Sequence, residues 1–315
     1  MIVALAGGVG GAKLADGLAR VVAPDGLTIV VNTGDDFEYL GLYVSPDLDT
    51  VMYTLAGRNN SETGWGLAGE TWAFMAALER LGGETWFRLG DQDMATHVER
   101  TRRLSDGDTL SEVTAELCDR FGIRHLIVPM SDDPVRTMVL IGGGRLAFQD
   151  YFVRLECTPR VAGFEFDGAK TARPSPKLST VMGSDSISAA IICPSNQYVS
   201  IGPILAIPQI ARWIGERKFP VIAVSPIVGG RALKGPAAKM MAELDVEVSA
   251  LAVARHYGAF LDGMMIDIAD EALAPAIEAE GPRVAVTGTI MNSAADRARL
   301  AKDVVTFAKT LETRR

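Results

Sequence analysis

Short apolar runs that alternate with helix-length amphipathic segments constrain the fold of this chain more than any other feature. The runs are continuous, which is typical of parallel strands buried on both faces. We expect strands at residues 2–6, 27–31, 125–128, 189–193, 221–224 and 283–287. We expect helices at residues 12–22, 71–81, 94–104, 110–121, 207–216, 235–244, 248–257 and 292–311. The alternation predicts an α/β fold with a doubly wound, mostly parallel sheet.

One region departs from this rhythm. Residues 135–141 and 146–154 flank a run of three glycines and are predicted to form a β-hairpin. Residues 158–177 contain prolines and little periodicity. We therefore expect an inserted lobe over residues 135–180 on a core formed by residues 1–134 and 181–315.

Composition excludes several classes of partner. The chain has 315 residues and a net charge of −8 at pH 7, and a field of that sign repels nucleic acid and anionic lipid. No apolar run approaches the ~20 residues of a membrane-spanning helix, so we expect neither nucleic acid nor a membrane as a partner. Cys118, Cys157 and Cys193 are widely spaced and form no CxxC pair, which predicts reduced thiols in a cytoplasmic protein.

The first unusual loop, at residues 7–13, follows the first predicted strand, where open α/β sheets bind ligands. It is not a dinucleotide fingerprint, because the third glycine position holds Lys13. It is not a Walker A motif, because Ala12 precedes that lysine and Leu14 follows it. The loop is either a tight turn or a phosphate site at a helix N-terminus. We favour the phosphate site, with contacts from Gly8, Gly10, Gly11 and Lys13.

Four aspartates follow the second predicted strand on two neighbouring loops. Asp35 and Asp36 end the first loop, and Asp47 and Asp49 lie on the second. Adjacent carboxylates repel one another, and Mg²⁺ prefers oxygen ligands of this kind. The sequence therefore predicts a magnesium site. The alternative for Asp47 is that it caps the helix that follows it.

Three further loops carry candidate binding residues. Arg88 precedes a glycine turn, Asp91 or Asp93 is expected to cap the next helix, and His97 is interpreted as a structural hydrogen-bonding residue. The loop after the fourth predicted strand offers neutral donors and a site of close backbone approach, namely Ser195, Asn196, Ser200 and Gly202. Lys234 lies before a predicted helix, where a phosphate contact and a solvated surface lysine are equally good interpretations. No nucleophilic triad stands out, and phosphoryl transfer needs mainly positioning and charge neutralisation.

Taken together, these segments resemble the 2-phospho-L-lactate transferase family of coenzyme F420 biosynthesis. The similar segments lie in order along nearly the whole chain. They include GGVGGAKLADGL at 7–18, VVNTGDD at 30–36, SPDLDTVMYTLAG at 45–57, RLGDQDMATH at 88–97, VPMSDDPVRTMV at 128–139, CPSNQYVSIGPILAIP at 193–208 and AVSPIVGGRALKGPAAKMM at 223–241.

The resemblance implies a Rossmann-like core with a smaller lobe and a homodimeric enzyme. It implies that a ribityl hydroxyl of the deazaflavin FO attacks the substituted phosphorus of a guanosine-diphospho donor, which gives F420-0 or an analogue and GMP. It also implies that Asp49 and Arg88 bind the deazaflavin and that Mg²⁺ lies near Asp35 and Asp49.

We combine these lines into one hypothesis. Asp35 and Asp49, with Asp36 or Asp47, hold Mg²⁺ across the donor diphosphate, and Asp36 accepts the hydroxyl proton. Gln197 stands where many relatives have proline, so the donor acid stays open among phospholactate, phosphoenolpyruvate and 3-phosphoglycerate. One rival is a non-catalytic regulator that binds nucleotide sugars. Another is a nicotinamide oxidoreductase, which the missing third glycine disfavours.

Overall fold

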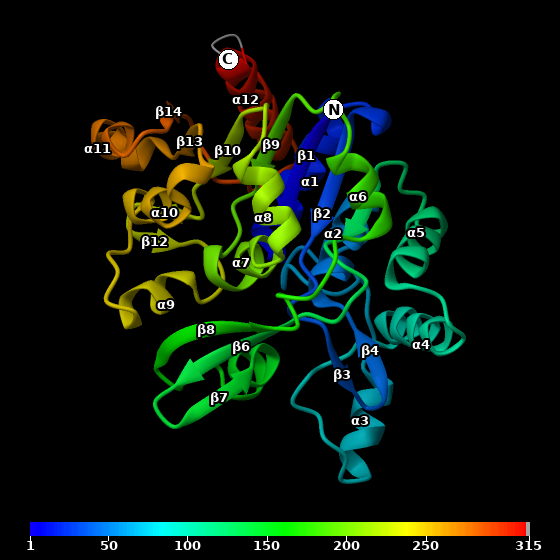
Figure 1. Ribbon diagram of the computed structural model, residues 1–315. Coiled ribbons are helices and arrows are strands. Elements are labelled where there is room, and N and C mark those ends of the chain that lie inside the picture. Colours follow the sequence, from blue (N-terminus) through cyan, green and yellow to red (C-terminus); the bar gives the residue numbers. More distant parts are fainter. Residues whose placement is uncertain (313–315) are drawn as a thin grey trace.

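A seven-stranded parallel sheet forms the centre of the computed structural model, which describes residues 1–312 (Figure 1). The strand order is β14-β13-β10-β9-β1-β2-β5, and every neighbouring pair is parallel. The strands are β1 (Ile2–Ala6), β2 (Leu27–Val31), β5 (Leu126–Pro129), β9 (Ala189–Ile192), β10 (Val221–Val224), β13 (Gly263–Ile266) and β14 (Arg283–Val286). The predicted α/β fold with a doubly wound parallel sheet is confirmed.

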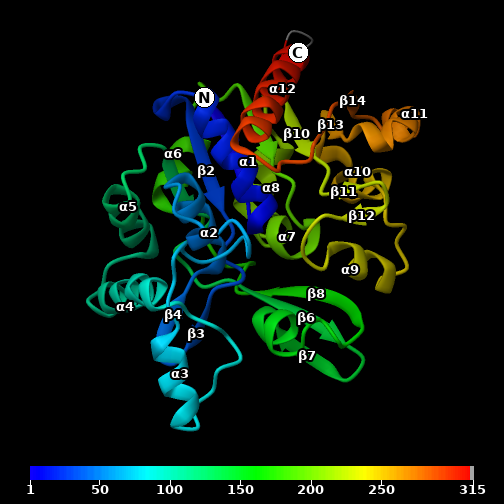
Figure 2. The ribbon, with the colours of Figure 1, turned by 180° about the vertical axis from the view of Figure 1, so that it is seen from behind.

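Helices cover both faces of this sheet. One face packs against α1 (Gly8–Val21), α2 (Pro46–Leu55), α5 (Leu110–Arg120) and α12 (Ala294–Glu312), as seen from behind in Figure 2. The other face packs against α6 (Pro176–Met182), α7 (Gly202–Leu205), α8 (Pro208–Gly215), α10 (Ala250–Tyr257) and α11 (Ala274–Ala279). Two apolar layers therefore enclose the sheet, which explains why its strands read as continuous apolar runs.

The predicted elements agree with the structure apart from a few boundaries. Strand β13 was not predicted, because its glycine and methionines carry little β-strand signal. Helix α1 begins at Gly8 rather than at residue 12. Between β10 and α10 the chain also forms helix α9 (Ala237–Glu243) and a two-stranded antiparallel ribbon of β11 (Ile227–Val228) and β12 (Arg231–Ala232).

The inserted region folds as a three-stranded antiparallel sheet of order β7-β6-β8. Strands β6 (Arg136–Ile141) and β7 (Gly144–Ala147) form the predicted hairpin. The expected extent of its second arm was wrong, because Asp150–Arg154 forms a π-helical turn. The stretch expected to be irregular contains β8 (Val161–Asp167), which pairs with the free edge of β6.

A second projection lies beside the lobe at the lower end of the view in Figure 1. It consists of an antiparallel hairpin, β3 (Phe37–Tyr39) and β4 (Leu42–Val44), and of α3 (Ala73–Arg80). Helix α4 (Asp91–Ser105) packs against β4. No helix among residues 1–312 is long and apolar enough to cross a membrane. Cys118 and Cys193 are buried free thiols, and Cys157 is half-buried and also free.

Candidate functional site

The loops after β1 and β9 meet where the strand order reverses, which is the point at which open α/β sheets bind ligands. Two glycines of α1 allow this approach. A Cβ on Gly10 would lie 2.2 Å from the carbonyl oxygen of Pro194, and a Cβ on Gly11 would lie 2.5 Å from Ser195 Oγ. Both glycines therefore serve the packing of α1 against the β9 loop. Their predicted contact with a ligand stays a prediction.

The β9 loop is held in place by its own polar side chains. Ser195 Oγ donates to the carbonyl oxygen of Gly7 at 2.8 Å. The Asn196 side chain accepts a bond of 2.9 Å from the N–H of Tyr198 and caps the π-helical turn Gln197–Ile201. A Cβ on Gly202 would lie 2.9 Å from Phe166 in the lobe. These residues fix the shape of the loop and the position of the lobe beside it.

Gly8 has a positive φ of 62°, a conformation that glycine adopts without strain. Its N–H, the first amide of α1, donates to Asp47 Oδ1 at 2.7 Å. The interpretation of Asp47 as the cap of its own helix is therefore wrong. Ser45 precedes α2, and Asp47 instead satisfies the N-terminus of α1. Ser200 lies alongside, since a Cβ on Gly7 would be 2.7 Å from its Cβ.

Asn32, at the end of β2, joins two of the aspartates. Its Nδ2 donates to Asp35 Oδ1 at 3.1 Å and to Asp47 Oδ2 at 2.9 Å. Asp36 turns the other way and accepts from Ser45 Oγ at 2.9 Å and from the Tyr43 hydroxyl at 3.1 Å. Its second oxygen, Oδ1, is buried and has no hydrogen-bond partner among the described residues.

These carboxyl groups are held away from water. Burial raises the pKa of Asp35 well above its usual range, and the nearby Asp47 and Asp36 raise it further. Burial raises the pKa of Asp36 to about 7 and that of Asp47 to about 6. Asp35 and Asp47 share one amide, and the neighbouring Asp36 has a buried oxygen without a partner among the described residues. Such a group fits a divalent cation, which would supply the missing positive charge.

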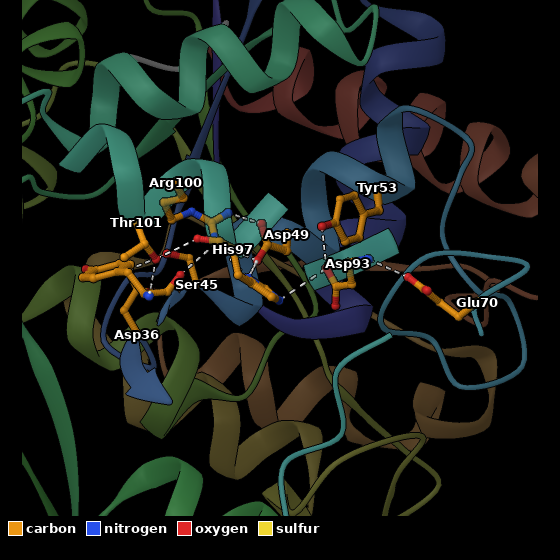
Figure 3. A network of polar contacts seen from close by, with 10 residues as sticks. Asp36, Ser45, Asp49, Tyr53, Glu70, Asp93, His97, Arg100 and Thr101 are labelled. Carbon is orange, nitrogen blue, oxygen red and sulfur yellow. Dashed lines mark hydrogen bonds and ion pairs between the residues drawn. The ribbon is translucent and has the colours of Figure 1, made fainter. Parts of the chain in front are cut away.

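Asp49 has a different set of partners (Figure 3). Its two oxygens accept from the guanidinium of Arg100, one of them at 3.0 Å. His97 Nδ1 lies 3.7 Å from Asp49, and His97 Nε2 lies 3.5 Å from Asp93. Asp93 accepts a hydrogen bond of 2.5 Å from the Tyr53 hydroxyl. The structure thus brings Asp35, Asp36 and Asp47 together and places Asp49 beside Arg100.

The predicted cap of α4 was also wrong. Asp91 accepts from the N–H groups of Ala73 and Phe74 and so caps α3 rather than its own helix. Glu70 does this for α4, because it accepts from Gln92 N and Asp93 N at 2.8 Å each.

The three basic residues predicted for the site each contact a different part of the chain. Lys13 Nζ donates to the carbonyl oxygen of Met291 at 2.9 Å. Burial lowers the pKa of Lys13, and the charges of Arg297 and Lys234 lower it further. Lys234 is exposed, and its Nζ donates to Thr63 O at 3.3 Å. Arg88 is exposed, and its guanidinium lies 4.3 Å from the ring centroid of Trp72.

Sequence reasoning missed two residues of this site. Asn32 lies within the VVNTGDD segment at 30–36. An amide at the end of a strand does not indicate in the sequence to which carboxylates it will donate hydrogen bonds. Arg100 lies three residues after His97, which places both on the same helix face. This spacing was the one sequence feature that could have indicated that Arg100 lies near the site.

A family model, described as 2-phospho-L-lactate transferase CofD, matches residues 2–303. The chain belongs to this family. As a member of the 2-phospho-L-lactate transferase family it is a transferase, so neither the non-catalytic regulator nor the oxidoreductase has support. The family resemblance in the sequence is confirmed.

Individual relatives match nearly the whole chain. It is 43% identical to a phosphoenolpyruvate transferase of Kitasatospora aureofaciens, over 98% of each chain. It is 37% identical to a 2-phospho-L-lactate transferase of Methanosarcina mazei, over 96% of this chain and 99% of that one. A crystal structure of a UPF0052 family member from Bacillus halodurans superposes with a TM-score of 0.62 at 12% identity, covering 96% of this chain and 98% of that one. At that identity the likeness concerns the fold alone.

Proposed function

We propose that this transferase moves a substituted phosphoryl group from a guanosine-diphospho donor to the ribityl hydroxyl of the deazaflavin FO, in F420 biosynthesis. The products are F420-0 or an analogue and GMP. One observation carries the proposal. A buried group of carboxylates, Asp35, Asp36 and Asp47, lies beside the N-terminus of α1 where the strand order reverses. Charge neutralisation and alignment at such a point are what phosphoryl transfer requires.

The residues fit Mg²⁺, which would neutralise the diphosphate charge and stabilise the leaving GMP. Asp35 and Asp49 would hold it, with Asp36 or Asp47. A carboxylate offers about four lone-pair sites, so Asp49 can accept from Arg100 and still contribute an oxygen. The raised pKa values of Asp35, Asp36 and Asp47 support this arrangement, since burial raises them and a cation would supply the positive charge that favours the ionised carboxylates.

The donor would lie against the start of α1. Gly8 and Ser200 line that point, and Lys13 and Lys234 bring positive charge close to it. The helix N-terminus and these lysines favour phosphate oxygens.

The acceptor would lie on the side of Asp49 and Arg88. Asp36 would accept the proton of the attacking hydroxyl. Burial raises the pKa of Asp36 to about 7, and a general base works best when its pKa is close to the operating pH.

Among the relatives, those 42–43% identical over nearly the whole chain are phosphoenolpyruvate transferases, and those 37–38% identical are 2-phospho-L-lactate transferases. We therefore take the enolpyruvyl donor as the first to test. Gln197 is fully buried, and its amide has no hydrogen-bond partner within the described part of the chain.

The test is to incubate the protein with FO, Mg²⁺ and one guanosine-diphospho donor at a time, carrying phosphoenolpyruvate, phospholactate or 3-phosphoglycerate. A new deazaflavin phosphodiester together with GMP supports the proposal, and its mass identifies the acid. Binding of both substrates without product would refute it. We also propose a cytoplasmic homodimer, as the family resemblance implies, and light scattering tests its oligomeric state.

A further inference from the structure

Arg100 is the only lysine or arginine that is buried among the residues that the structure describes, with 1% of its surface exposed. It lies in the second half of α4 and contacts Asp49 of α2 and Tyr43 of β4. Arginine is almost never fully buried unless it is paired. Three buried aspartates lie close enough to interact with its charge: Asp36, Asp49 and Asp93. The burial of Arg100 therefore requires a structural or functional explanation.

The guanidinium of Arg100 binds one carboxylate, that of Asp49, through both of its oxygens. Nη1 donates to Asp49 Oδ2 at 3.0 Å, and Nη2 donates to Asp49 Oδ1. Nη1 also lies 3.3 Å from His97 Nδ1 and 3.5 Å from the carbonyl oxygen of Tyr43. A planar guanidinium that binds both oxygens fixes the orientation of the carboxylate, which the single charge of a lysine does not do.

The helix that carries Arg100 is itself fastened to the site. Thr101 Oγ1 accepts from Tyr43 N at 2.7 Å and donates to the carbonyl oxygen of His97 at 2.7 Å. The hydroxyl of Tyr43 donates to Asp36. Helix α4 is thereby joined through β4 to the aspartate on the other side of the arginine, as Figure 3 shows.

We propose that Arg100 is a positioning residue, which holds the Asp49 carboxylate in the orientation that binds the acceptor. The inference rests on the proposed function, because it takes Asp49 to contact the deazaflavin. Arg100 acts through Asp49 and does not itself touch substrate.

A metal ion among Asp49, Asp93 and His97 is the competing explanation for this cluster, since one ligand atom from each lies within 4.8 Å of the others. The cationic Nη1 of Arg100 lies 3.3 Å from His97 Nδ1 and would repel a metal ion there. Asp93 already accepts a hydrogen bond from the Tyr53 hydroxyl. The network is therefore organised around the arginine.

The experiment is a double-mutant cycle on FO affinity, measured by calorimetry with the full-length protein. We expect Arg100→Lys to weaken FO binding about tenfold or more and to leave affinity for the guanosine-diphospho donor within twofold. We expect Asp49→Asn to weaken FO binding as well. If Arg100 acts through Asp49, the double variant binds FO no more weakly than Asp49→Asn alone. Additive losses would overturn the inference.

A matched control is Arg217→Lys, which alters a partly buried arginine–aspartate pair, Arg217 with Asp262 at 2.9 Å, outside the site. It should lower thermal stability and leave FO affinity unchanged. If Arg100→Lys does not fold, Thr101→Val replaces it, because loss of the Thr101 contacts moves α4 without removing a charge. Thr101→Val should weaken FO binding in the wild-type background and not in the Asp49→Asn background. A wild-type protein that does not bind FO would refute the proposed function and this inference together, whereas additivity refutes the inference alone.

Discussion

The carboxylate of Asp47 accepts a hydrogen bond of 2.7 Å from the N–H of Gly8, so an internal anion already occupies the first amide of α1. The same carboxylate accepts from Asn32, which also donates to Asp35. The end of β2, the start of α1 and the start of α2 are therefore joined through one side chain. Asp47 therefore has a structural role at the point where we place the donor. Mutation can distinguish the contribution of its charge from that of its hydrogen bonds.

Asp47→Asn keeps an oxygen that accepts from Gly8, whereas Asp47→Ala removes that acceptor and leaves the N–H of Gly8 without its side-chain partner. An unsatisfied buried group costs about 1–3 kcal/mol. We expect Asp47→Ala to lower the free energy of unfolding by about that amount relative to Asp47→Asn. Urea unfolding measures the difference. Equal stability of the two variants would show that the Gly8 bond contributes nothing.

Asp35→Asn should abolish transfer and leave the protein folded. The reason is that Asp35 is expected to hold Mg²⁺, while its one side-chain hydrogen bond, from Asn32, can also be accepted by an amide oxygen. A ligand that binds only the folded state stabilises it, by about 2.7 kcal/mol at one hundred times the dissociation constant. Mg²⁺ should therefore raise the unfolding temperature of the wild type and not that of Asp35→Asn.

Asp185→Asn, which changes an exposed aspartate, is the control and should respond to Mg²⁺ as the wild type does. Wild-type turnover by Asp35→Asn, or by protein treated with a chelator, would remove the metal assignment. Retained Mg²⁺ stabilisation in Asp35→Asn would do the same without any reference to the reaction.

Six of the seven strands of the central sheet and most helices could be predicted, because burial on both faces of a parallel sheet leaves a local mark in the sequence. The position of the acidic loops also followed, since loops after parallel strands meet at one edge. The partners of Asp47 and Asp91 could not be predicted. Both lie at the start of a helix, where a local rule makes them caps of that helix, yet each binds the first turn of another helix. Which helix end a carboxylate meets depends on packing between segments distant in sequence.

Arg100 illustrates the same limit. Its sequence neighbours, Glu99, Thr101, Arg102 and Arg103, are polar, so the local pattern predicts a solvated helix face. The arginine is buried only because α4 packs over β4 and α2, where Asp49 stands. A buried cation therefore cannot be distinguished from a surface one until the neighbouring carboxylate is placed.

Stability without metal should fall as pH rises. Burial raises the folded-state pKa of Asp36 to about 7, above its ordinary value of 3.8. The folded protein then binds more protons than the unfolded chain between these values, so stability decreases with pH across that window and levels off above about pH 7. We expect metal-free protein to be more stable at pH 5.5 than at pH 8, by on the order of 2 kcal/mol.

Denaturant unfolding at the two pH values, with and without Mg²⁺, measures this difference. Asp36→Asn cannot ionise at this position and should show a smaller dependence on pH than the wild type does. An unchanged dependence in Asp36→Asn would assign the titration to another group. If added Mg²⁺ did not reduce the dependence, the acidic cluster would not be the place where the metal binds.

Arg88→Ala should weaken FO binding and spare the fold. Arg88 is exposed, and its described contact is with the Trp72 ring at 4.3 Å, a cation–π arrangement worth about 0.5–1 kcal/mol at an exposed site. The unfolding temperature should therefore change little, whereas the KM for FO should rise about tenfold, since a loss near 1.4 kcal/mol is tenfold in affinity. Steady-state kinetics with FO varied at saturating donor measures the effect. Arg80→Ala, on the exposed end of α3, is the matched control. A KM for FO that is unchanged in Arg88→Ala would remove Arg88 from the acceptor site and leave Asp49 as its remaining predicted contact.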